Sequence, residues 1–179
     1  MSNMTKKPQL TLSEALKLAM SRITDLKGRS RRSEYWWTAL VMGIAGWILG
    51  FIPLIGLFIS IAISLFMIPL GIRRLHDSGH SGWWYIIAMI IGLVAGGNYF
   101  MKVFPIVEKY ADSGNVEKMA DKMLEVYSDP LVICSMLACL IIGIIMLVFL
   151  CQDSKPAPNK WGVSPKYGDS TEDDLQVVE

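Results

Sequence analysis

The stretch of the chain that most constrains its fold is residues 35–72, which contain no charged side chain. A single α-helix over this stretch would be about 57 Å long at 1.5 Å per residue, far longer than a bilayer core of roughly 30 Å. Pro53 and Gly56 lie near its middle and favour a turn there. We therefore predict two membrane spans, at about 36–52 and 54–72.

Two further apolar segments, at about 83–100 and 131–150, have the length of membrane spans. The composition agrees, because 53% of the residues are hydrophobic and only 18% are charged, against about a quarter in soluble proteins. The apolar residues are gathered in blocks and do not alternate between the faces of amphipathic helices. We predict an all-α membrane protein with four transmembrane helices.

Two segments outside these spans have helical periodicity. Apolar residues recur every three or four positions between 10 and 26, which predicts an N-terminal amphipathic helix. This helix could lie in the membrane interface, pack on the rest of the fold, or do both. Residues 102–129 mix both charges, and Asn115 is placed to cap a helix that begins at Val116. We expect this segment to be a short helical insert on the extracytoplasmic side.

The distribution of lysine and arginine predicts the orientation of the chain. With four spans, thirteen of the 17 basic residues fall on one side and four, all in the insert, fall on the other. Cytoplasmic loops are enriched in these residues, so both termini should be cytoplasmic. The predicted organisation is an N-terminal amphipathic segment (1–27), a four-span membrane domain (28–152) and a cytoplasmic tail (153–179).

Polar residues gather at two places beside the spans. One group directly precedes the first span, and the other lies in a predicted hairpin at 71–84, between the second and third spans. The proposed topology brings both groups to the cytoplasmic face. The candidate binding residues are Arg29, Arg31, Arg32, Glu34, Arg73, Arg74, His76 and Asp77.

Two interpretations of these residues remain open. Glu34 and Asp77 could each form ion pairs with arginines of the other segment, since charges in a partly dry layer need partners. Alternatively, some arginines could remain free to bind a lipid-headgroup phosphate or another anion, because the guanidinium group makes bidentate hydrogen bonds to phosphate.

Other chemistry has weaker support in the sequence. His76 and His80 are four apart, but Gly79 argues against a helix there, and zinc commonly takes three or four protein ligands. The serines of the same turn do not make a convincing nucleophile and base, and the spans lack the ionisable groups of a coupled transporter. We therefore predict no metal, cofactor, catalytic residue or nucleic-acid partner, and the sequence favours a protein that is not an enzyme.

Three motifs occur in order, GRSRRSEYWW (28–37), RRLHDSGHSGWW (73–84) and NKWGVSP (159–165). Together they resemble the bacterial inner-membrane family called domain of unknown function 805. The resemblance implies a small four-span protein of the bacterial inner (plasma) membrane and no known reaction. Two features depart from the family: members usually have a short link where this chain has residues 102–129, and usually have Tyr at the position of Trp161.

Two functions from different classes follow. The first is a structural or interaction protein, such as a subunit, with a membrane-protein partner or a second copy of itself. The second is a module that binds membrane lipids with anionic headgroups through the arginines.

Overall fold

The computed structural model describes residues 4–52, 55–111 and 114–169. Within these residues the protein has six α-helices and two short β-strands. The chain divides into two compact units: the first contains Met1–Tyr85 and Val148–Glu179, and the second contains Ile86–Leu147.

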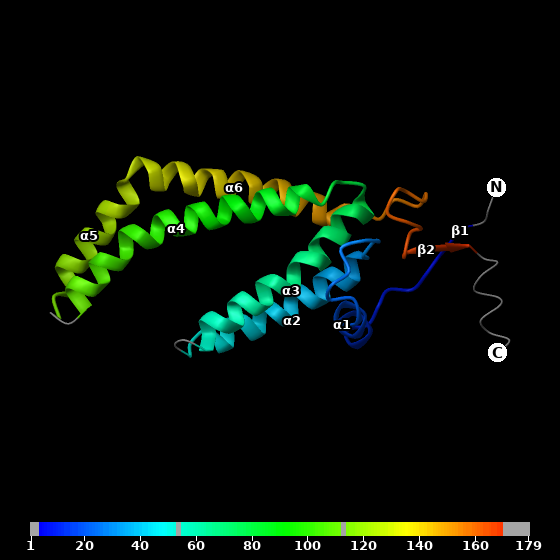
Figure 1. Cartoon of the computed structure of the whole chain (residues 1–179), viewed down its shortest axis with the longest axis horizontal. Helices are drawn as coiled ribbons and strands as arrows, with labels where there is room; N and C mark the ends of the chain where they lie inside the picture. The colour runs from blue at the N-terminus through cyan, green and yellow to red at the C-terminus, as the bar shows by residue number, and fades with distance from the viewer. Residues whose placement is uncertain (1–3, 53–54, 112–113, 170–179) are drawn as a thin grey trace. The chain divides into compact units, whose positions relative to one another are not determined.

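The first unit contains the elements at both ends of the chain (Figure 1). They are β1 (Met4–Lys6), α1 (Leu12–Ser21), α2 (Arg32–Leu49), α3 (Ile55–Ser78) and β2 (Tyr167–Asp169). Helix α1 begins with a capping box, in which the Thr11 side chain accepts from the Glu14 N–H and Glu14 accepts from the Thr11 N–H. Its buried Ala15 and Ala19 allow close packing against α2. Its predicted place in the membrane interface stays a prediction.

Helices α2 and α3 lie side by side, and glycines permit their close approach (Figure 1). A Cβ added at Gly46 would lie 3.3 Å from Ile63 of α3, and one at Gly56 would lie 2.9 Å from the Cα of Gly50. The sequence Gly46-x-x-x-Gly50, a spacing that lets helices approach closely, therefore packs within the chain. Pro53 of the predicted turn lies outside the described residues.

Helix α3 continues through the polar residues 73–78, so the prediction of a hairpin over this part is wrong. Their side chains form hydrogen bonds and ion pairs with other segments, so these polar groups are satisfied without exposure to water and the helix can continue. Gly79, at φ 88°, ends the helix. Its N–H donates to the carbonyl of His76, and the N–H of His80 donates to that of Leu75, which is a Schellman motif. The turn to α4 is confined to residues 79–82.

The two strands join the segments before α1 and after α6. Strand β1 pairs antiparallel with β2, with Met4 opposite Asp169 and Lys6 opposite Tyr167. The pairing continues in the hydrogen bond from the Lys7 N–H to the Lys166 carbonyl, at 2.9 Å. Residues 152–169, called the tail below, are thus fixed to the N-terminal segment.

The second unit contains most of α4 (Trp83–Ala111) and α6 (Pro130–Cys151), with α5 (Val116–Ser128) between them. Asn115 accepts from the Lys118 N–H and caps α5, which confirms the predicted helix start. Asp129 accepts from the N–H groups of the first turn of α6, at 2.9 and 3.2 Å. The side chain of Asp129 also forms an ion pair with Lys102, which fixes α4 to this turn.

Among the residues that the structure describes, three helices are long and apolar enough to cross a membrane: Ile55–Ser78, Trp83–Tyr110 and Pro130–Cys151. Large apolar side chains on them are exposed, such as Phe58 at 69% and Leu93 at 67%, as lipid-facing positions require. Helix α2 has 18 residues but is not among the three, since its first turn contains Arg32 and Glu34. The first predicted span, at about 36–52, and with it the count of four spans, stays a prediction.

Candidate functional site

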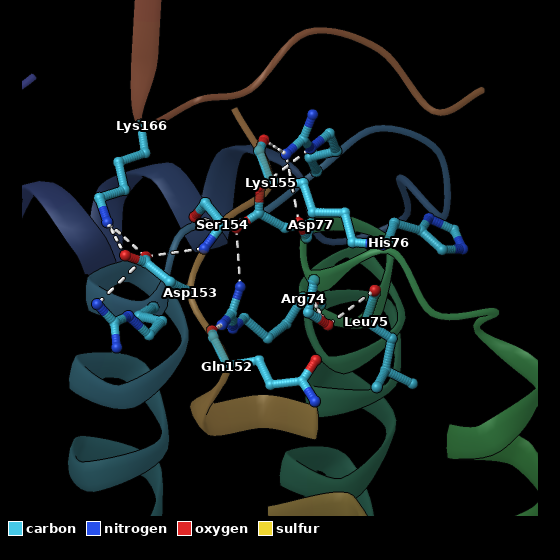
Figure 2. A network of polar contacts seen from close by, with 12 residues as sticks. Arg74, Leu75, His76, Asp77, Gln152, Asp153, Ser154, Lys155 and Lys166 are labelled. Atoms are coloured by element: carbon cyan, nitrogen blue, oxygen red, sulfur yellow. Dashed lines mark hydrogen bonds and ion pairs between the residues drawn. The ribbon is translucent and has the colours of Figure 1, made fainter. Parts of the chain in front are cut away.

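A carboxylate enclosed by two guanidinium groups lies at the C-terminal end of α3. The Oδ1 of Asp77 accepts from Arg29 Nε at 3.0 Å, and its Oδ2 accepts from Arg74 Nη1 at 2.8 Å. The hydroxyl of Ser154 also donates to Oδ2, as Figure 2 shows. The side chains of all three charged residues are 0–1% exposed. Asp77 is therefore an ion pair partner inside the first unit, as predicted.

Arg74 also binds the end of α6. Its Nε donates to the Leu150 carbonyl at 3.0 Å. Its Nη2 donates to the Gln152 carbonyl, as Figure 2 shows. Arg32 donates to the carbonyl between them, that of Cys151, at 3.3 Å. The last carbonyls of a helix have no partner within it and form the negative end of its dipole. Two arginines from other segments thus cap α6.

Arg29 holds the tail by its backbone. Its Nη1 donates to the carbonyls of Ala157 and Gly162, at 3.1 and 3.4 Å, and its Nη2 donates to that of Lys155. The Lys155 N–H donates in turn to the Asp77 carbonyl, at 3.1 Å. Because the buried guanidinium group uses its donors within the protein, it closes the tail over the end of α3.

Arg73 connects α3 to the segment that follows α1. Its Nη1 donates to the carbonyls of Arg22 and Asp25, at 2.5 and 2.6 Å, just after α1. Its Nη2 makes a long contact of 3.5 Å with Glu34 Oε1. Glu34 is fully buried, and its Oε2 has no hydrogen-bond partner. The second predicted cross-segment ion pair is present but weaker than the pairs of Asp77.

The NKWG segment of the tail packs on the same helix end. The imidazole of His76 stacks on the indole of Trp161, with centroids 4.2 Å apart and ring planes at 9°. Asn159 Nδ2 donates to the His76 carbonyl at 3.0 Å, and its Oδ1 accepts from the Trp161 N–H. His76 Nδ1 lies 3.2 Å from the Gly28 carbonyl. His76 is thus used for packing and hydrogen bonding.

More exposed charges surround this core. Arg31 donates to the carbonyls of Lys7 and Pro8, and burial lowers the pKa of its guanidinium group. Asp153 pairs with Lys166 and, at 3.2 Å, with Arg32. The hydrogen bond from Lys166 holds the pKa of Asp153 below its ordinary value. Arg32 remains 45% exposed at its side chain.

The structure brings all eight predicted residues into the first unit. Seven are buried, and Arg32 is exposed. Sequence reasoning missed Ser154, Asp153 and Lys166. The charges of Asp153 and Lys166 were a weak indication that the tail takes part in the site. Nothing in the sequence distinguished Ser154 from an ordinary serine of a linker. Below, the arginine cluster means Arg29, Arg73 and Arg74 with Asp77 and Glu34.

Comparison with known proteins supports the resemblance. The family model described as "Protein of unknown function (DUF805)" matches residues 23–163. The "Inner membrane protein YhaI" of Escherichia coli (strain K12) is 35% identical over 79 residues, which cover 40% of this chain and 67% of that protein. The protein of the same name from Escherichia coli O157:H7 has the same identity and coverage. No solved structure matches the chain.

Proposed function

Because the chain belongs to the DUF805 family and is a membrane protein, we propose that it acts in a bacterial inner membrane as a structural or interaction protein. Its arginine cluster joins the N-terminal segment (residues 4–31) to the tail, and we call this set of contacts the lock. The region that the lock holds together lies on the cytoplasmic side and is called the cap below. The cap gives a partner subunit a fixed surface, and the arginine cluster is not a reaction centre.

The burial of the arginine cluster is the observation that carries this proposal. Arg29, Arg73 and Arg74 are 0–3% exposed. Between them they donate to eight backbone carbonyls, in addition to the two carboxylates. Removing one partner from such a network leaves buried polar groups unpaired, which is costly, so the network favours one arrangement of the segments. A ligand would have to displace these bonds to reach the guanidinium groups.

A topology of four spans with both termini cytoplasmic has two supports. The thirteen-to-four division of Lys and Arg favours it. In addition, β1 pairs with β2, and the tail contacts the end of α3. Segments that are in contact outside the hydrocarbon core lie on the same side of a membrane, so these contacts favour placing both termini on the side of this helix end.

We expect Arg29→Gln to release the tail. The substitution removes the charge and most of the donors that hold three tail carbonyls and Asp77. Trypsin should then cleave the tail after Lys160 at least about tenfold faster, since each 1.4 kcal/mol of lost closing energy raises the open population about tenfold. Timed proteolysis of the purified protein, followed by intact mass, measures this rate.

Lys27→Gln is the matched control, because Lys27 is exposed and its substitution removes the same charge from the same segment. Its cleavage rate should equal that of the unsubstituted protein. Equal rates for Arg29→Gln and Lys27→Gln would contradict the lock. Recovery of the slow rate when anionic lipid is added to Arg29→Gln would instead favour a lipid-binding role for the arginine cluster.

The topology has its own test. In a variant without native cysteines, Glu117→Cys in α5 should react with a membrane-impermeant maleimide in intact cells, whereas Pro158→Cys in the tail should react only after the cells are opened. Both positions are exposed in the structure, so the reagent reports the side of the membrane. Labelling of Pro158→Cys in intact cells would refute the orientation.

A further inference from the structure

A cavity of about 690 Å³ lies beside the arginine cluster and is not part of it. All its lining residues belong to the first unit: Lys6, Lys7, Gln9, Arg31, Arg32, Ser33, Trp36, Trp37, Leu40, Cys151, Ser154 and Lys166. They come from the N-terminal segment, the start of α2, the end of α6 and the tail. Its volume lies within the range of small-molecule sites, roughly 300–1,000 Å³.

One part of the lining is strongly basic. Five of the twelve lining residues are Lys or Arg, and none is Asp or Glu. Asp153 holds Arg32 and Lys166 in place, but its side chain is 49% exposed and lies outside the lining. The lining itself therefore carries an excess of positive charge, which favours an anion in the cavity.

The other part of the lining is aromatic and apolar. Trp36, Trp37 and Leu40 lie on the first turns of α2, and they are 39%, 40% and 51% exposed. Tryptophan is enriched at the headgroup level of membranes. The lining therefore changes from cations to exposed aromatic rings over a short length of α2, which is the order of groups in a phospholipid from phosphate to acyl chain.

We propose that this cavity binds an anionic phospholipid. The phosphate lies among Arg32, Lys166 and Lys6, and the glycerol and first methylenes cover Trp36, Trp37 and Leu40. Of the two cations that pair with Asp153, Arg32 is the more available, because its side chain is 45% exposed and its contact with Asp153 is a surface ion pair of small worth. A free anion such as phosphate would satisfy the cations but leave both indoles uncovered.

The test measures the melting temperature of the full chain in neutral detergent during titration with short-chain phosphatidylglycerol. Parallel titrations use short-chain phosphatidylcholine and inorganic phosphate. A ligand that binds the folded state raises the melting temperature, and the concentration dependence gives its affinity. We expect stabilisation by phosphatidylglycerol and none by the other two probes at equal concentration.

Three variants identify the site. Arg32→Gln should weaken binding of phosphatidylglycerol about tenfold or more, as loss of a charge-assisted hydrogen bond does. Asp153→Asn should strengthen it, because it removes the negative charge that competes for Arg32 and Lys166. Lys17→Gln, an exposed position of α1 outside the lining, should leave it unchanged. If Arg32 and Asp153 had purely structural roles, both substitutions would instead change the affinity for phosphatidylglycerol in the same direction.

Two results would overturn the proposal. Equal stabilisation by inorganic phosphate and phosphatidylglycerol would identify a site for a soluble anion. Equal affinities of Arg32→Gln and Lys17→Gln for phosphatidylglycerol would place lipid binding elsewhere on the protein. Neither result would affect the lock at Arg29, whose test is cleavage of the tail without lipid.

Discussion

Asp77→Asn should destabilise the protein more than any other single change of charge at the cap. The substitution leaves Arg29 and Arg74 buried without the carboxylate that pairs with both. Removing one partner of a buried pair typically costs about 3–5 kcal/mol, because the remaining charge is uncompensated. Chemical denaturation in a neutral detergent, followed by tryptophan fluorescence, measures the change in the free energy of unfolding.

The matched control is Asp121→Asn in α5, where an exposed aspartate loses the same charge. Its free energy of unfolding should stay within about 0.5 kcal/mol of that of the unsubstituted protein, as for most surface substitutions. The double variant Asp77→Asn with Arg74→Gln should lose less than the sum of the two single changes, since they share one interaction. Equal stabilities of Asp77→Asn and Asp121→Asn would show that the buried pair does not hold the cap.

Gly71→Ala is the second change with a large expected effect. A Cβ at Gly71 would overlap the ring of Tyr85, at the start of α4. Both residues belong to the first unit, and Gly71 is buried. An extra methyl group in a packed interior usually costs about 1–3 kcal/mol, and here the aromatic ring and the start of α4 must shift. The melting temperature in detergent should fall accordingly.

Gly92→Ala provides the comparison, because Gly92 also lies in a helix, but apart from its chain neighbours and the nearby backbone of its own helix no atom lies within 4 Å of the position that a Cβ would take. That variant should be as stable as the unsubstituted protein or slightly more stable, since Ala is the better helix former. Combining Gly71→Ala with Tyr85→Ala should cost less than the two separate changes added together. A melting temperature of Gly71→Ala equal to that of Gly92→Ala would contradict the close contact.

The sequence predicted much of the helical architecture because helix signals are local. The uncharged stretch at 131–150 corresponds to α6, and Asn115 caps α5, which begins at Val116 as predicted. The ion pairs of Asp77 and Glu34 also followed from elementary reasoning, since a carboxylate removed from water needs a partner.

The errors arose where distant segments decide the local structure. The charged residues at 73–78 suggested a water-exposed turn, yet this segment is helical. Its arginines donate to distant backbone carbonyls, Arg73 to that of Arg22 and Arg74 to that of Leu150. Arg29, which pairs with Asp77, donates to the carbonyl of Lys155. No local pattern in the sequence indicates which backbone carbonyls a long side chain will reach. The β1–β2 pairing was missed for the same reason, because three-residue strands have almost no periodicity of their own.

The capping of α6 by Arg32 and Arg74 also determines when the protein can finish folding. These arginines are made and inserted before α6, and their carbonyl partners at 150–152 leave the ribosome only after the helices that precede them have been synthesised. Until then the guanidinium groups have no helix end to cap. The part of the first unit that contains these contacts can therefore close only after α6 has been synthesised to its end.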